Sequence, residues 1–149
     1  MAYIPPNAQW YVAELVEEIC VEGDARNVVH RNLVLVKASS PEDAYRRAMD
    51  LGQQRELTYR NPEGRTVVSR FRGLRELDVV HDPLEHGAEL RFCEDISVPE
   101  ERVATWLKTK EQLNVFCDVE PSKGRPNYSC KEIVDEVVRL IHQDSQNQD

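Results

Sequence analysis

The stretch SPEDAYRRAMDLG, residues 40–52, decides the fold because it carries the start, the buried face and the end of one helix. Ser40 is a favourable N-cap, and Pro41 suits the first helical position. Asp43 follows Ser40 by three residues, which is capping-box spacing with Asp in place of the usual Glu. These signals predict a helix that begins at Pro41.

The same stretch also defines which side of the helix is buried. Ala44, Ala48 and Leu51 recur at helical spacing and form one apolar stripe, which we expect to pack on a sheet. Gly52 comes directly after the stripe, where a glycine commonly ends a helix in the left-handed conformation. The sequence therefore predicts a helix that ends at Gly52.

Two hairpins are predicted on either side of this helix. Residues 10–21 and 28–38 read as strands joined by a turn, and residues 57–60 and 65–72 flank the turn NPEG. Glu17 interrupts the apolar alternation of the first strand, so a bulge or a strand end is expected near it. The run LVLV at 33–36 is apolar on both faces, which is typical of a central strand covered on both sides.

Further elements complete the predicted fold. Residues 74–80 and 88–93 read as additional strand, residues 99–107 as a short helix opened by a capping box from Ser97 to Glu100, and residues 129–141 as a helix after a linker at 118–128. The fold class is therefore α+β: an antiparallel sheet of about five to six strands with one helix packed across it, a ββαββ core, and a helical C-terminal extension. We expect a core domain at 1–98 and an extension at 99–149, packed on the core or on a second subunit.

Composition limits the classes of function. The 149 residues carry a formal net charge of -8, which argues against nucleic acid and acidic membranes as partners because both are polyanions. The chain shows no basic and apolar leader and no run of about 20 apolar residues. Its four cysteines form no C-x-x-C pair, which favours reduced thiols in the cytoplasm over a structural zinc site. No cofactor is predicted.

Five strings in order carry a resemblance to a known family. They are WYVAEL at 10–15, NLVLVKA at 32–38, SPEDAYRRA at 40–48, FRGLREL at 71–77 and HGAEL at 86–90. In that order and spacing they resemble the domain of unknown function 4288, a small bacterial family, over about residues 9–98. The resemblance implies no established activity and no catalytic residues, so it supports the fold alone.

One candidate site is the loop at 81–87. His81, Asp82, Glu85 and His86 offer imidazole and carboxylate groups that suit zinc or manganese. The two histidines are five residues apart, however, and Pro83 and Gly87 indicate an irregular loop whose polar groups would simply be solvated. The spacing matches no established metal motif.

A second candidate is the pair Arg70 and Arg72, which alternate along one strand. With His30 or Arg31 nearby they could bind a carboxylate or a phosphate. The competing interpretation is ion pairing with Glu14 and Glu18 of the first strand, and surface ion pairs are far commoner than anion sites. We therefore expect ion pairs.

The sequence favours a small non-enzymatic binding or assembly module that acts through protein–protein contacts, as a homodimer or with a protein partner. The alternative is a small metal- or anion-binding enzyme that uses the 81–87 loop and the Arg70/Arg72 face. A third interpretation, a partner that masks the basic surface of a toxin, rests on the acidic charge alone.

Overall fold

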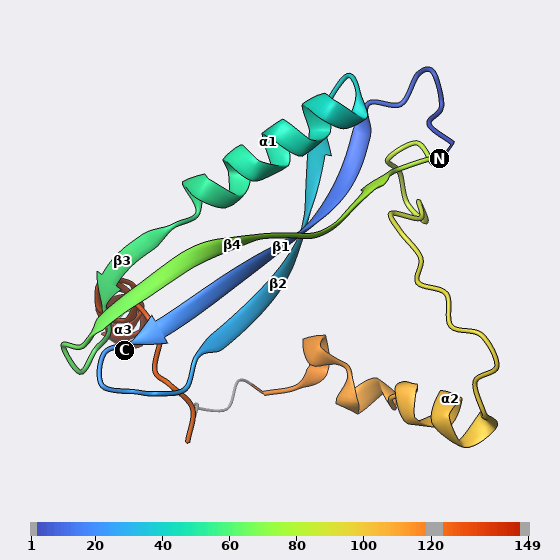
Figure 1. Ribbon diagram of the computed structural model, residues 1–149. Helices are drawn as coiled ribbons and strands as arrows, with labels where there is room; N and C mark the ends of the chain where they lie inside the picture. The colour runs from blue at the N-terminus through green and yellow to red at the C-terminus, as the bar shows by residue number, and fades with distance from the viewer. Residues whose placement is uncertain (1–2, 119–123, 147–149) are drawn as a thin grey trace. The chain divides into compact units, whose positions relative to one another are not determined.

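The structure, a computed structural model, describes residues 3–118 and 124–146 (Figure 1). Within these residues the fold is α+β, with four strands and three α-helices. In chain order they are β1 (Trp10–Val21), β2 (Val28–Lys37), α1 (Pro41–Gln54), β3 (Leu57–Arg60), β4 (Thr66–Val79), α2 (Glu100–Trp106) and α3 (Lys131–Gln146). Two short 3-10 helices lie at Lys110–Gln112 and Asn114–Phe116.

The chain divides into two compact units. The first contains the described residues up to Arg91 and from Arg125 onward, and it holds the sheet, α1 and α3. The second lies within Phe92–Gly124 and holds α2 and the 3-10 helices. The capping box expected at Ser97 is wrong, because Pro99 is the N-cap of α2 and no side chain caps that helix.

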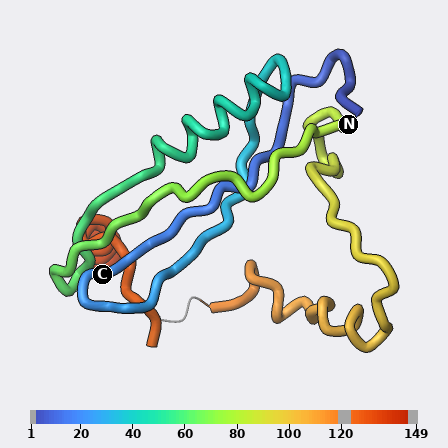
Figure 2. Tube along the Cα trace, viewed as in Figure 1, coloured from blue at the N-terminus to red at the C-terminus, as the bar shows by residue number. Residues whose placement is uncertain are grey.

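The sheet has the order β2-β1-β4-β3, and all its neighbouring strands are antiparallel. The prediction of five to six strands in a ββαββ core is not matched, because the described residues form a sheet of four. Residues 74–79 continue β4 as one strand, and residues 88–93 form no strand and follow the irregular path visible in Figure 2. A bulge lies near Glu17 as predicted, since the β1–β4 register shifts between Val16 and Glu17.

The place of β2 is the main correction to the sequence analysis. The run at 33–36 predicts a central strand, yet β2 is an edge strand and β1 is central. Val36 is buried, whereas Leu33 is 63% and Leu35 is 41% exposed. One face of β2 therefore packs against the core as expected, and its other face has no cover in the described residues.

Helix α1 begins as the sequence predicts. The Ser40 hydroxyl accepts a hydrogen bond from the Asp43 amide (3.1 Å), which satisfies one of the free amides of the first turn. The Asp43 carboxylate turns back to the amide of Ser39 (3.1 Å). Hydrogen bonds from that amide, Arg46 and Arg47 hold the pKa of Asp43 well below its ordinary value.

The end of α1 differs from the prediction. The helix continues to Gln54, Arg55 is its C-cap in a right-handed conformation, and Gly52 has no positive φ. A Cβ at Gly52 would lie 2.4 Å from the ring of Phe71 on β4. Gly52 is therefore needed for the close approach of α1 to the sheet and does not terminate the helix.

The core lies between α1 and one face of the sheet. Ala44 and Ala48 are fully buried and pack with Tyr11, Leu15 and other residues of that face. At about 1.5 Å per residue α1 is roughly 21 Å long, whereas β1 at about 3.3 Å per residue is roughly 40 Å. The helix therefore covers only half of the face, and a second apolar cluster of Ile19, Val21 and Val67 lies beyond its end.

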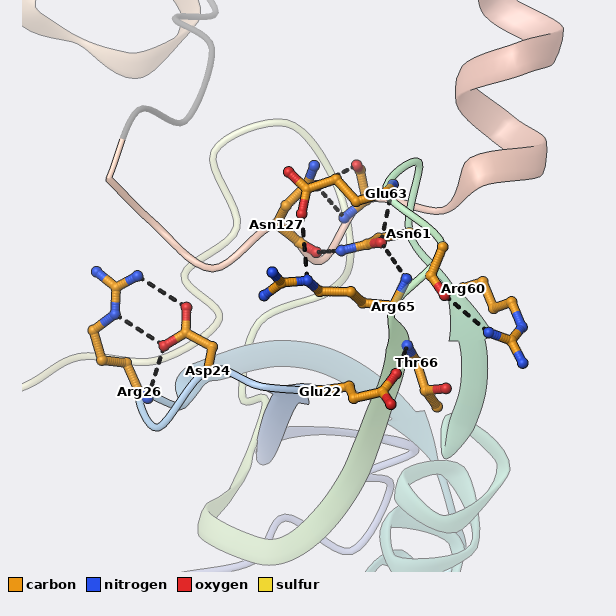
Figure 3. Close-up of polar contacts among 11 residues, drawn as sticks. Glu22, Asp24, Arg26, Arg60, Asn61, Glu63, Arg65, Thr66 and Asn127 are labelled. Atoms are coloured by element: carbon orange, nitrogen blue, oxygen red, sulfur yellow. Dashed lines mark hydrogen bonds and ion pairs between the residues drawn. The ribbon is translucent and has the colours of Figure 1, made fainter.

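Residues 125–130, here called the strap, contact the end of this face beyond α1, and Figure 3 shows Asn127 of the strap beside Asn61. Asn61, fully buried in the turn between β3 and β4, donates from Nδ2 to the Asn127 carbonyl at 2.9 Å. Its Oδ1 accepts from the amides of Glu63 (3.1 Å) and Arg65 (2.9 Å). The ring of Tyr128 meets His30 edge-on with centroids 5.3 Å apart. The strap is thus fixed to the sheet, and α3 follows it.

Candidate functional site

A network of charged groups occupies the sheet face opposite α1. Glu14 of β1 is only 7% exposed and accepts hydrogen bonds from Arg75 (3.0 Å) and Arg91 (3.1 Å). Arg91 also lies 3.0 Å from Asp78, so this arginine bridges two carboxylates. Burial tends to raise the pKa of Glu14, but the hydrogen bonds from Arg75 and Arg91 outweigh it and lower the pKa. These contacts hold Arg91 against the face, although residues 88–91 form no strand of the sheet.

Arg70 and Arg72 form ion pairs on the same face, as the sequence predicts. Arg72 Nη1 lies 2.8 Å and Arg70 Nη2 lies 3.8 Å from the same oxygen of Glu18. Hydrogen bonds from Asn27 and Arg72 lower the pKa of Glu18, so the carboxylate stays ionised. An anion bound by these arginines would have to displace a carboxylate that is already in place.

The 81–87 loop is exposed along its length. His81 and Asp82 line a pocket of about 240 Å³ beside Trp10, whereas Glu85 and His86 are not part of its lining. Asp82 accepts a hydrogen bond from the amide of Glu89 at 2.9 Å. Across residues 3–118 and 124–146, no group of three or more His, Cys, Asp or Glu side chains could hold a metal ion.

The outer edge of the sheet carries an uncovered apolar surface. Val29, Leu33 and Leu35 of β2, here called the β2 row, are 50%, 63% and 41% exposed. Their β1 partners are Glu18, Glu14 and Val12, so the row shares the face of the charged network. Arg31 and Lys37 are the only formally charged residues of β2.

Helix α3 presents a second uncovered apolar surface. Five residues on it, here called the α3 stripe, are between 47% and 62% exposed: Ile133, Val137, Val138, Leu140 and Ile141. Helix α3 begins at Lys131, two residues after the predicted start at Ser129, and the Ser129 hydroxyl donates to Asn127 Oδ1 at 2.5 Å. None of the helices in the described ranges has the length and apolar composition of a membrane span.

The sequence predicts ion pairs of Arg70 and Arg72 with Glu14 and Glu18, but in the structure both arginines pair with Glu18, and Glu14 pairs with other arginines. Glu14 and Arg91 are 77 residues apart, and no short-range pattern links them. The β2 row did leave a signal, since residues 33–36 are apolar on both faces. The signal was assigned to a central strand, whereas the structure places it at an edge.

One comparison with known proteins gives a match. A family model described as Domain of unknown function (DUF4288) matches residues 10–91, the stretch from the start of β1 to the arginine that binds Glu14. No curated protein and no solved structure matches the chain. The matched range covers the complete sheet and α1.

Proposed function

Because the chain belongs to the family of the domain of unknown function DUF4288, whose description names no activity, we propose a function from the sheet itself. The protein is a non-enzymatic assembly module that forms a homodimer, with β2 of one copy paired antiparallel to β2 of the other. The observation that carries this proposal is the conflict at β2. A strand with the sequence of a covered central strand stands at an open edge.

The backbone of β2 is suited to pairing. Its register with β1 is unbroken from Trp10↔Lys37 to Ile19↔Val28, and it contains no proline. A long regular edge presents unpaired amides and carbonyls to another strand. Antiparallel pairing of two identical edges is self-complementary and closes as a two-fold dimer. It also brings the two β2 rows side by side, within reach of cross-strand contacts.

Charge supports a role for α3 in the same dimer. The helix carries four acidic and two basic residues, whereas β2 carries Arg31 and Lys37 and no acidic residue. We infer that the α3 stripe contacts the dimer at the β2 edge, with its carboxylates near Lys37, because Arg31 already lies 3.8 Å from Glu14. Complementary potentials of this kind fix the orientation of partners more than they add affinity.

The alternative, a small metal- or anion-binding enzyme, gains no supporting observation in the described residues. Arg70 and Arg72 already face Glu18, and the 81–87 loop brings only His81 and Asp82 to a pocket.

We propose the cytoplasm as the location because all four cysteines are free. Cys20, Cys93 and Cys117 are exposed, and such thiols persist where the compartment is reducing. Alkylation in intact cells should modify these thiols, and disulfide-linked chains would contradict the proposal.

Light scattering of Leu33→Glu and the full chain tests the dimer. A charge placed in the joined rows should weaken dimerisation by about 100-fold, whereas folding should be unaffected because Leu33 is 63% exposed. Tyr45→Glu is the matched control, since Tyr45 is a 52% exposed apolar residue on α1. A full-length monomer at high concentration, or equal dimerisation of both variants, would overturn the proposal.

A further inference from the structure

A pocket of about 460 Å³ lies on the α1 face, between the end of α1 and the strap. It exists because α1 is shorter than the strands beneath it and the strap covers only the far end. Its volume falls within the range of about 300–1,000 Å³ that is usual for small-molecule sites. Of the candidate site residues named from the sequence, only His30 lines it.

The floor of this pocket carries an ion pair where the strand pattern calls for an apolar residue. Glu17 continues the row of Tyr11, Ala13, Leu15 and Ile19 on β1, and its side chain is 9% exposed. The carboxylate pairs with Nε of Arg55, the C-cap of α1, whose side chain is 46% exposed. A half-exposed pair of this kind adds little stability over two apolar residues, so stability does not account for Glu17.

The remaining walls combine aromatic and apolar side chains with the polar Gln54 and Ser69. His30 lies opposite Glu17 across the β1–β2 pairing, and the Tyr59 hydroxyl donates to the Tyr128 carbonyl. Ile19 and Ser69, which are 5% and 7% exposed, also line the pocket. An apolar body with a few convergent polar groups is the usual composition of a ligand site.

We propose that this pocket binds a small zwitterion with an apolar side group, such as a free α-amino acid, its ammonium at Glu17 and its carboxylate at Arg55. A ligand with a single charge would be attracted by one of these two groups and repelled by the other. A zwitterion meets both with the opposite sign, and its carboxylate can bind the Nη atoms of Arg55 while Nε keeps its contact with Glu17. The aromatic rings then contact the apolar side group.

Phenylalanine, titrated into the full chain and followed by amide chemical shifts, is the probe. Saturable shifts are expected at Glu17, His30, Ser69 and Tyr59, with a Kd in the millimolar range or below. Phenethylamine and 3-phenylpropionate, which each lack one charge, should bind at least about tenfold more weakly. Absence of localised shifts up to about 10 mM phenylalanine, or equal binding of the three compounds, would overturn the proposal.

Two variants divide the roles of the charges. Arg55→Gln should weaken the binding of phenylalanine about tenfold and leave the binding of phenethylamine unchanged or tighter. Glu17→Gln should likewise weaken the binding of phenylalanine and leave the binding of 3-phenylpropionate unchanged or tighter. Arg46→Gln, on an exposed part of α1, is the control and should bind phenylalanine as tightly as the unsubstituted protein does. If Glu17→Gln does not fold, Arg55→Gln alone tests the proposal. Unchanged binding of phenylalanine by Arg55→Gln would contradict the placement of the ligand carboxylate at Arg55. Leu33→Glu should bind normally, since the pocket lies within one copy.

Discussion

Replacing Gly52 by alanine should destabilise the protein, although the same change usually stabilises a helix. Alanine at a helix-interior position is favoured over glycine by about 0.5–1 kcal/mol. At Gly52 the new methyl group would lie 2.4–2.5 Å from three ring atoms of Phe71, which is inside van der Waals contact. Either the ring must rotate away or α1 must lift from the sheet.

The cost of overpacking against Phe71 is larger than the gain in helix preference, so the change should be destabilising. Overpacking of this kind costs about 1–3 kcal/mol. From the middles of the two ranges, Gly52→Ala should lower the free energy of unfolding by about 1 kcal/mol. For a chain of this length the midpoint Tm should fall by about 2–4 °C.

A double-mutant cycle with Phe71→Ala isolates the contact. Without the ring, Gly52→Ala should stabilise by about 0.5–1 kcal/mol, which gives a coupling of about 2 kcal/mol between the two positions. Gln53→Ala, next to it on the exposed side of α1, should change stability by no more than about 0.5 kcal/mol. Urea denaturation measures all of these variants. A higher Tm for the Gly52→Ala variant that keeps Phe71 would refute the close approach of α1 to β4.

Three further predictions follow from the polar contacts and from α3. Asn61→Ala should lower the free energy of unfolding by about 2–3 kcal/mol in urea denaturation, because three hydrogen bonds of a buried side chain are lost; unchanged stability would contradict the role of Asn61. Asp43→Asn should make the free energy of unfolding depend less steeply on pH in acid. A carboxyl whose pKa is depressed in the folded state stabilises the fold at pH values above its ordinary pKa of 3.8, and this stabilisation is lost as the pH falls toward the folded pKa. An unchanged pH dependence would show that Asp43 is not a determinant of acid stability. Ending the chain after Cys130 should preserve the far-ultraviolet spectrum of the sheet and weaken dimerisation about tenfold in light scattering; an unaltered dimer would remove α3 from the interface.

The parts of the fold that sequence predicts well are those fixed by near neighbours. The cap at Ser40, the buried face of Ala44 and Ala48, and the turn at residues 61–64 each depend on side chains a few residues apart. The bulge near Glu17 was visible for the same reason, since a single charge interrupts a regular alternation.

The failures come from contacts between distant segments. Gly52 was assigned to a helix end because glycine commonly stands there, whereas a ring 19 positions later on β4 decides its role. The 88–93 segment alternates like a strand, yet Arg91 binds Glu14 and Asp78 on the sheet face. For β2 the pattern correctly indicates a strand that is apolar on both faces, but it cannot indicate that the strand lies at an edge of the sheet.

Hydrogen exchange along β2, measured over a range of protein concentrations, tests the central claim most directly. An edge strand leaves alternate amides directed away from β1, where they exchange freely unless another strand pairs with them. The account predicts that these amides are protected at concentrations where the dimer predominates, and that dilution or Leu33→Glu removes the protection. Freely exchanging outer amides of β2 in a sample that scatters as a dimer would contradict the account.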